Sequence, residues 1–163
     1  MHKVAFDQLV AADIMQRDVL TIAPQETLRD ALLMMTGNHV TGLPVMDEHG
    51  RCIGLISATD ILNFEQDHAD EEAESEMLQF YNPENEQWES VPASAFGLEE
   101  MGEVRVEEVM ATDLIWVDRN KPLKEGARKM LDARIHRVLV MDDTLHLFGL
   151  VSSFDFVRVV AEK

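Results

Sequence analysis

Two Ser-x-x-Asp quartets are the residues of this sequence best suited to bind a ligand. Ser57 and Asp60 form the first quartet, and Ser152 and Asp155 form the second. Each serine ends an apolar run, so we expect each quartet where a strand gives way to a helix. A carboxylate there can accept hydrogen bonds from both hydroxyls of a ribose, and the free N–H groups of a helix start favour an anion. Each quartet therefore has groups that a nucleotide site needs.

The same quartet is also a helix-capping pattern. In a capping box the serine hydroxyl accepts a hydrogen bond from the backbone of the fourth residue, whose side chain accepts one from the serine N–H. Taken alone, either quartet only stabilises the helix that begins at residue 58 or 153. The capping interpretation therefore stays open beside the binding interpretation.

The two quartets belong to a repeat with a constant spacing. Met15 and Met110 are 95 residues apart, and so are Asp60 and Asp155, with no gap between them. We call residues related by this spacing counterparts. Identical counterparts include Leu28/Leu123, Met35/Met130, Val45/Val140, Gly54/Gly149 and Ser57/Ser152. A duplicated supersecondary unit explains this match, and such units usually bury their apolar faces against each other.

Each copy of the repeat predicts a βαββα unit. In the first copy Thr27 and Asp30 predict the N-terminal cap of a helix, which Gly37 and Asn38 end. The other expected elements are a strand over 19–22, a hairpin of strands over 43–46 and 52–56, and a second helix that starts at residues 57–60. In the second copy the same states are expected over 115–117, 123–134, 138–141, 147–151 and 153–161.

In combination, these residues resemble the CBS (cystathionine-β-synthase-type) domain family in both copies. The resemblance rests on Asp13–Met15, Leu43–Asp47 and Gly54–Asp60, and in the second copy on Glu108–Met110, Ile135–Val140 and Gly149–Asp155. It implies an α+β fold in which two βαββα repeats pack as a pseudo-twofold pair. It also implies a central cleft for up to two adenosyl ligands, frequent dimerisation, and no catalysis. We assign residues 1–62 to repeat 1, 63–105 to an acidic insertion, and 106–163 to repeat 2.

The resemblance also assigns ligand-binding roles. Ser57, Asp60, Ser152 and Asp155 would hold ribose and phosphate, and His136 and Arg137 would contact phosphate. In the first copy Thr21, Gly42, Leu43 and Pro44 would line the slot for the base. Trp116 stands in place of Thr21 in the second copy, where it either stacks on an adenine or fills its slot. We therefore expect the site built on Asp155 to be the weaker of the two.

Composition excludes several partners. The formal charge is −17 and the isoelectric point is near 4.5, the wrong sign for a nucleic acid or an anionic membrane. Cys52 is the single cysteine, which fits a reducing compartment. The first residues do not resemble a secretory signal, and no stretch approaches the ~20 apolar residues of a membrane span. We expect a soluble, cytoplasmic protein.

Charge is distributed unevenly along the chain. The range 63–105 holds thirteen acidic residues and one basic residue, Arg105. Within it, Asp67, His68 and Asp70 could attract a divalent ion, but a chance histidine in an acidic run is the preferred interpretation. The bulky residues of 80–83 and Trp88 predict a lid, a segment docked on the repeats, or a partner contact.

Seven of the 14 basic residues fall between residues 119 and 137. Among them, we expect Lys124, Arg128 and Lys129 to form the solvated face of a helix.

Two functions from different classes compete. The first is a non-catalytic regulatory module that binds an adenine nucleotide, AMP or ATP before others, in the cleft between the repeats and signals by a conformational change. The second is a structural dimerisation or scaffold module with vestigial sites. An enzyme is disfavoured because no nucleophile is paired with a base and no phosphate-binding Gly-rich loop is present. We expect no metal, a homodimer, and an effector protein yet to be identified.

Overall fold

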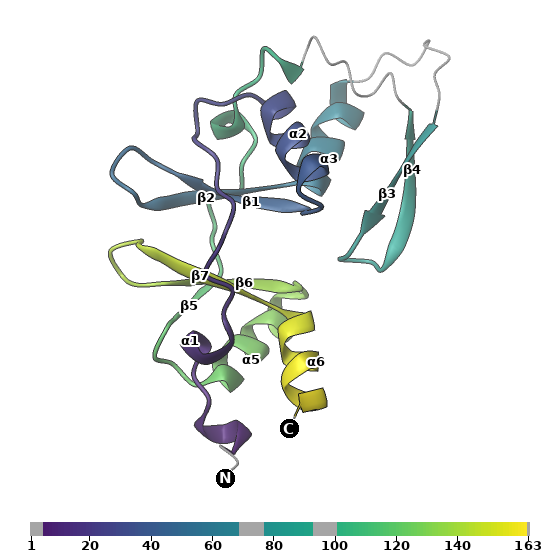
Figure 1. The fold of residues 1–163 in the computed structure, drawn as a ribbon. Helices are drawn as coiled ribbons and strands as arrows, with labels where there is room; N and C mark the ends of the chain where they lie inside the picture. The colour runs from purple at the N-terminus through teal and green to yellow at the C-terminus, as the bar shows by residue number, and fades with distance from the viewer. Residues whose placement is uncertain (1–4, 69–76, 93–100, 163) are drawn as a thin grey trace. The chain divides into compact units, whose positions relative to one another are not determined.

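The computed structural model describes residues 5–68, 77–92 and 101–162 (Figure 1). The chain forms two compact units. Unit 1 comprises Met1–Val19, Gly50–Cys52 and Leu114–Lys163, and unit 2 comprises Leu20–His49 and Ile53–Asp113. The N-terminal segment therefore groups with the second repeat.

Unit 2 contains the four main elements of the first repeat. Helix α2 spans Leu28–Gly37, strands β1 and β2 span Gly42–Met46 and Cys52–Ser57, and helix α3 spans Ala58–His68. The two strands form a two-stranded sheet, with α2 and α3 on one side of it (Figure 1). The predicted cap of α2 is confirmed, because Thr27 Oγ1 accepts a hydrogen bond from the Asp30 N–H at 3.2 Å.

The predicted strand over 19–22 is wrong, because only Ile22 pairs with β1. Its N–H donates to Pro44 O at 3.0 Å, and its carbonyl accepts from Met46 N at 2.9 Å. Pro24 follows closely and has no N–H with which to extend the ladder. Its counterpart in the second repeat is Arg119, and there a regular strand forms, β5 over Trp116–Asp118.

Unit 1 contains the second repeat in the predicted order. Strand β5 is followed by α5 over Leu123–Ala133, β6 over Arg137–Met141, β7 over Leu147–Ser152 and α6 over Ser153–Glu162. The sheet order is β5-β6-β7, with β5 parallel to β6 and β6 antiparallel to β7. Helices α5 and α6 lie on one side of this sheet (Figure 1). The N-terminal segment adds a 3₁₀ turn, Phe6–Gln8, and the short helix α1, Ala11–Ile14.

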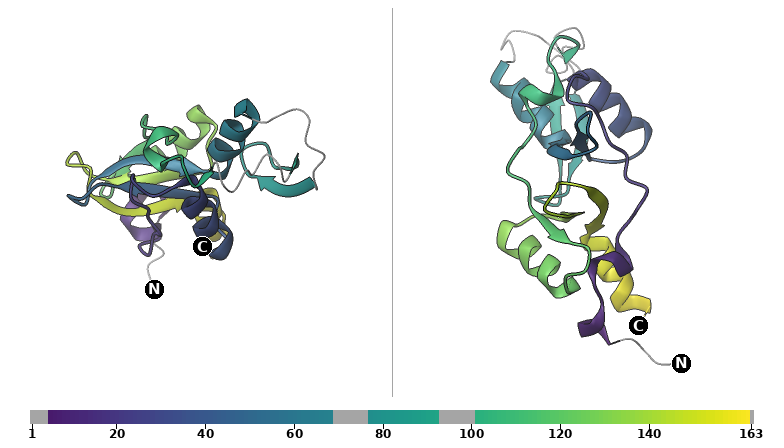
Figure 2. Two further views of the ribbon diagram at one scale, coloured as in Figure 1. Left: turned by 90° about the horizontal axis from the view of Figure 1, so that it is seen from above. Right: turned by 90° about the vertical axis from the view of Figure 1, so that its left-hand side faces the viewer.

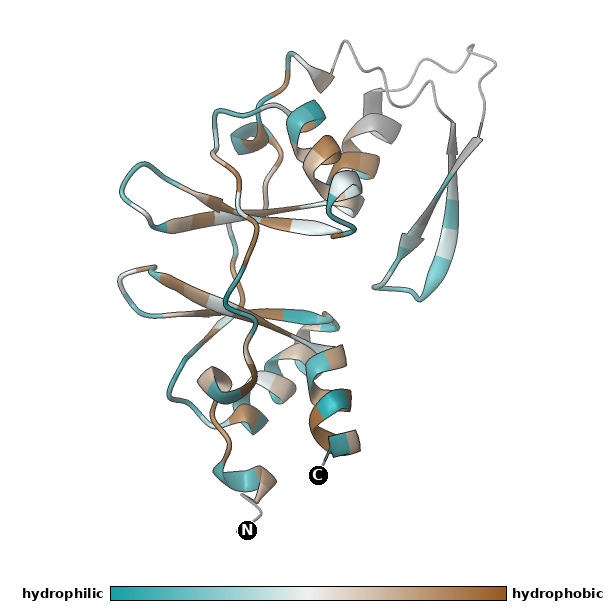
Figure 3. Ribbon diagram, viewed as in Figure 1, coloured by the Kyte–Doolittle hydropathy of each residue, from teal (hydrophilic) through white to brown (hydrophobic). Residues whose placement is uncertain are grey.

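Each unit buries its own apolar core. Leu28, Leu43, Ile56 and Ile61 are fully buried in unit 2, and Val106 joins them from the residue that follows the range 63–105. The core of unit 1 is built from residues of α5, the sheet, α6 and the N-terminal segment: Leu9, Ala11, Met15, Leu123, Met130, Val138, Val140, Val151 and Val159. Hydrophobic stretches recur along the strands of both repeats, whereas α6 alternates along its length (Figure 3).

The segment that leads into each repeat packs on a strand of the other repeat. Gln16 exchanges two backbone hydrogen bonds with Leu150, of 2.8 and 3.0 Å, and Ala111 exchanges two of 2.9 Å with Leu55. The neighbouring glycines permit this approach. A Cβ on Gly149 would lie 2.6 Å from the carbonyl oxygen of Gln16, and one on Gly54 would collide with the side chain of Met110. The glycine of each repeat is thus explained by close backbone contact.

A separate hairpin follows α3. Strand β3, Met77–Asn82, pairs antiparallel with β4, Gln87–Pro92. Figures 1 and 2 show it as a twisted two-stranded ribbon. Sequence patterning did not predict these strands. Residues 69–76 and 93–100, which belong to the acidic insertion predicted at 63–105, lie outside the described residues.

Within the part of the chain that the structure describes, no helix is both long and apolar enough to cross a membrane.

Candidate ligand-binding site

The first quartet forms a capping box and keeps one carboxylate oxygen available. The Ser57 N–H donates to Asp60 Oδ2 at 3.0 Å, and the Asp60 N–H donates to Ser57 Oγ at 3.1 Å. The capping role weighed for this quartet is therefore realised at α3. Asp60 Oδ1 makes no hydrogen bond to any described residue, and the side chain is partly exposed. Capping thus uses one oxygen of Asp60 and leaves the other for a ligand.

Backbone hydrogen bonds bring the other candidates of the first repeat toward this helix start. The Ala58 N–H donates to Thr41 O at 2.9 Å, which places Gly42 beside the first turn of α3. The pairing of Ile22 with Pro44 places Thr21 alongside β1. Thr21, Gly42, Ser57 and Asp60 are all partly exposed. The structure therefore gathers these residues around β1 and the start of α3.

Leu43 and Pro44 differ from that group, because both are buried. Leu43 is fully enclosed in the core of unit 2. Any part that Leu43 plays in lining a slot for a base must therefore come from its main chain.

The second quartet forms the same cap, but its carboxylate is fully engaged. Asp155 Oδ2 accepts from the Ser152 N–H at 2.8 Å and from Ser152 Oγ at 3.0 Å. Gln16 Nε2 donates to Asp155 Oδ1 at 3.2 Å, and Arg158 Nη1 lies 3.8 Å from that same oxygen. The carboxylate is only 2% exposed. Both oxygens of Asp155 are thus occupied by partners within unit 1.

Two sequence differences between the repeats explain why the quartets are unequal. The counterpart of Gln16 is Ala111, whose methyl group cannot donate a hydrogen bond to Asp60. The counterpart of Arg158 is Asn63, which carries no charge. Gln16 was not among the predicted site residues. A comparison of the two leading segments could have identified it, because Gln16 stands where the other segment has Ala111.

His136 and Arg137 flank the start of α6. The Ser153 N–H donates to His136 O at 2.8 Å, the same bond that Ala58 makes to Thr41 in the first repeat. Arg137 lies opposite Ser152 in the β6–β7 register. Burial lowers the pKa of Arg137 because desolvation penalises its charged form. The candidates of the second repeat thus gather around the second quartet within unit 1.

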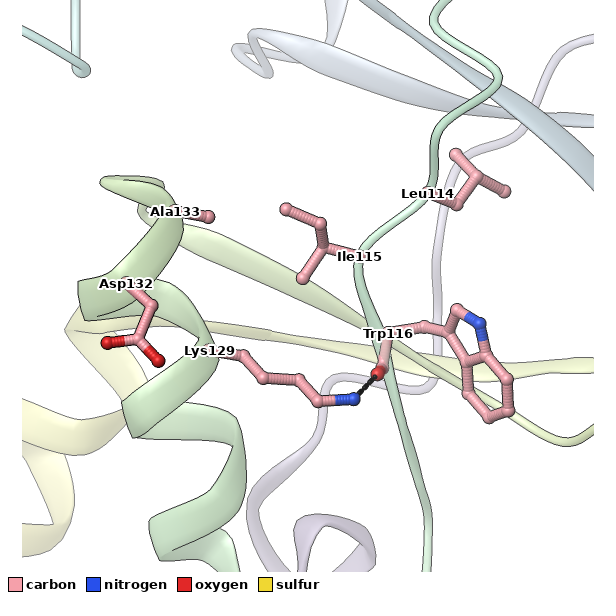
Figure 4. Close-up of a pocket in the computed structure, with 6 residues that line it drawn as sticks. All are labelled: Leu114, Ile115, Trp116, Lys129, Asp132 and Ala133. Carbon is pink, nitrogen blue, oxygen red and sulfur yellow. Dashed lines mark hydrogen bonds between the residues drawn. The ribbon is translucent and has the colours of Figure 1, made fainter.

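Trp116 lies at an open pocket of about 330 Å³ in unit 1. The lining residues are Leu114, Ile115, Trp116, Lys129, Asp132 and Ala133 (Figure 4). Lys129 Nζ donates to Trp116 O at 2.7 Å, so the expectation that Lys129 belongs to a solvated helix face is wrong. Figure 4 shows the indole on the other side of its strand from Ile115. In this structure the indole does not fill the pocket.

Among the described residues, no group of three or more histidine, cysteine or carboxylate side chains could hold a metal ion. The candidate group for a divalent ion comprised Asp67, His68 and Asp70, and Asp70 lies outside the described residues.

Comparison with known proteins identifies the repeats. The family model named CBS domain matches residues 10–67 and 106–162. The uncharacterized protein MJ1225 of Methanocaldococcus jannaschii is 28% identical over 152 residues, which cover 93% of this chain and 47% of that protein. This chain therefore spans about half the length of that relative.

Two solved structures share the fold over almost the whole chain. The CBS domain pair of protein MJ0100, in complex with 5′-methylthioadenosine and S-adenosyl-L-methionine, has a TM-score of 0.64 at 21% identity and covers 94% of this chain and 97% of that chain. CBSX2, in complex with AMP, has a TM-score of 0.67 at 20% identity and covers 94% and 96%. Both likenesses extend through the two repeats.

Proposed function

The chain belongs to the CBS domain family, and from this premise we propose that it is a non-catalytic regulatory module that binds an adenosyl ligand at the site built on Asp60. AMP and ATP are the ligands we favour. The complexes of MJ0100 and CBSX2 support an adenosyl ligand, because these pairs of the same fold were solved with such molecules.

The open oxygen of Asp60 carries the proposal. A ribose presents two neighbouring hydroxyl donors, and a charged acceptor strengthens each hydrogen bond to about 1.5–3 kcal/mol. The first turn of α3 contains this carboxylate, and it offers the Thr59 N–H and the positive end of the helix dipole to a phosphate. Ser57 remains partly exposed at the same place. One helix start thus provides both an acceptor for ribose and a favourable field for phosphate.

The comparison of Asp60 with Asp155 supports one strong site in each chain. A ligand hydroxyl at Asp155 would have to displace Gln16 and compete with Arg158. Breaking an existing hydrogen bond cancels most of the free energy that the new one contributes. We therefore assign the regulatory ligand to the first repeat.

Regulation follows from differential affinity. A ligand shifts a conformational equilibrium only as far as it binds one state more tightly than the other. We propose that ligand at Asp60 selects the conformation in which the chain, as a homodimer, meets its effector. The alternative, a dimerisation or scaffold module with vestigial sites, requires no ligand at all.

A thermal-shift panel separates these functions. The panel contains AMP, ADP, ATP, NAD, S-adenosylmethionine and cyclic dinucleotides. A ligand at ~100 times its dissociation constant adds about 2.7 kcal/mol of stability, so the transition should move clearly for at least one adenosyl compound. The shift should vanish in Asp60→Asn, which keeps an oxygen for the Ser57 N–H. If no compound moves the wild-type transition, the scaffold function replaces the regulatory one.

A further inference from the structure

The β3–β4 hairpin has one open aromatic face. Tyr81 pairs with Trp88 in the register, so the two side chains share a face of the hairpin. Their ring centroids are 5.6 Å apart in an edge-to-face arrangement, and the residues are 43% and 68% exposed. On the opposite face Asn82 is buried and donates a hydrogen bond to Glu89 at 2.9 Å. The two exposed rings are therefore available to a partner.

Acidic residues border this aromatic face. Glu84 and Glu86 lie in the turn between the strands, both are exposed, and neither makes an ion pair with any residue that the structure describes. The sequence over 77–92 contains no lysine or arginine. A two-stranded hairpin is only marginally stable by itself in water. Docking on a cationic surface that also offers apolar contact would stabilise it.

Helix α5 presents a surface of that kind. Lys124, Arg128 and Leu131 follow the spacing i, i+4 and i+7, so they share one face of the helix. Lys124 and Arg128 are exposed and have no hydrogen-bond or ion-pair partner among the described residues. Leu131 is 78% exposed between these cations and the end of the helix. The opposite side of α5 is buried in the core of unit 1.

The repeat shows that this surface is particular to α5. The counterparts of Lys124, Arg128 and Leu131 on α2 are Arg29, Leu33 and Thr36. The α2 face therefore carries one cation where the α5 face carries two, because its exposed leucine, Leu33, stands at the position of the second cation. The shared fold does not by itself require a basic face on this helix.

We propose that the aromatic face of the β3–β4 hairpin docks on the Lys124–Arg128–Leu131 face of α5 in a second copy of the chain. The cations would lie over the rings of Tyr81 and Trp88, and Leu131 would pack against them. Glu84 and Glu86 would add attraction to the same cations. The proposal rests on the homodimer of the proposed function and names its interface, independently of the ligand site.

Charge favours α5 of a second copy over a second hairpin as the occupant. The range 63–105 carries thirteen acidic residues and one basic residue, so two hairpins facing each other would repel. In a two-fold dimer the hairpin of each copy meets α5 of the other, and one favourable contact therefore forms twice.

Sedimentation equilibrium of the full chain at low ionic strength tests the interface. We expect a dimer whose dissociation constant rises about tenfold in Trp88→Ala and in Lys124→Glu. Added salt should weaken the dimer because these charges are exposed. The matched control is Arg29→Glu, the same charge change at the counterpart position on α2, which should leave the constant unchanged.

A charge exchange checks that the losses come from the interface and not from misfolding. Lys124→Glu with Arg128→Glu should weaken the dimer, and adding Glu84→Lys with Glu86→Lys should restore it. The proposal is overturned if the wild-type chain sediments as a monomer at every concentration. This includes a monomer whose hairpin docks on its own α5. A dimer that Trp88→Ala and Lys124→Glu leave unchanged also overturns it, and would point to another face such as Phe154, Val157 and Val160 on α6. Nucleotide binding, measured separately by thermal shift, should survive in every one of these variants.

Discussion

Gln16 donates its side-chain hydrogen bond to Asp155 at 3.2 Å, across the contact between the N-terminal segment and the second repeat. Asp60 lacks such a donor because Ala111 occupies the counterpart position. This difference in the leading segments, together with Arg158 in place of Asn63, explains how the two acceptors are used. Asp155 is incorporated into the packing of unit 1, whereas Asp60 keeps an oxygen for a ligand.

Replacing Ala111 by glutamine should close the first site. The new side-chain amide would donate a hydrogen bond to Asp60, as Gln16 does to Asp155. It would compete with the ribose hydroxyls for the same carboxylate oxygen. Losing one charged hydrogen bond of about 1.5–3 kcal/mol corresponds to at least a tenfold weaker ligand. Isothermal titration calorimetry with AMP measures this loss.

Ala111→Leu is the matched control, since leucine adds similar bulk without a donor. Ala111→Gln should weaken binding more than Ala111→Leu does. Equal losses would mean that size at position 111, and not a hydrogen bond to Asp60, governs the site.

Substitution of Gly149 should destabilise unit 1. A Cβ there would lie 2.6 Å from the backbone oxygen of Gln16 and 3.0 Å from Met15 Sδ, so the N-terminal segment must move. Overpacking of this kind costs about 1–3 kcal/mol. Urea unfolding of Gly149→Ala should show the loss.

Gly37→Ala serves as the reference for that measurement. A Cβ at Gly37 meets nothing within 4 Å, so the substitution should be neutral or slightly stabilising. If Gly149→Ala proves as stable as Gly37→Ala, the segment does not pack against β7 as described.

The hairpin should lose stability in acid through Glu89. Hydrogen bonds from the Asn82 and Asn85 side chains lower the pKa of Glu89 below its ordinary value of 4.5. A depressed pKa in the folded state stabilises the hairpin above the ordinary pKa, and this contribution is lost as the pH falls through the folded value. NMR titration of the Glu89 carboxyl measures it.

Asn82→Ala should raise the pKa of Glu89 toward 4.5 by removing one of the two amide hydrogen bonds that lower it. An unchanged pKa in this variant would show that the amide does not stabilise the carboxylate in solution.

Local patterns in the sequence predicted most of the fold. The Thr27–Asp30 capping box, the apolar face of α2 and both strand pairs of the repeats depend on residues close together in the chain, and the structure contains them. The constant spacing of 95 residues carried this prediction from one repeat to the other. The capping role of each quartet was also predictable, because it depends only on the four residues of the quartet.

Long-range relationships were not predictable in the same way. The hydrogen bond from Gln16 to Asp155 depends on packing between segments far apart in the chain, which no spacing reveals. Lys129 was expected to be exposed to solvent because the helix pattern placed it on the polar face. Its hydrogen bond to Trp116 O depends on the neighbouring strand, which that pattern does not include. The β3–β4 hairpin was missed because its strands hold mixed polar and aromatic residues with little alternation.

The central claim is that one adenosyl ligand binds each chain at Asp60. Calorimetric titration of the full chain with AMP or ATP measures the number of sites directly. We expect one strong site, lost in Asp60→Asn and retained in Asp155→Asn, because each variant makes the same change at the cap of its own helix. Two equal sites, or a site that Asp155→Asn removes and Asp60→Asn leaves intact, would contradict this account.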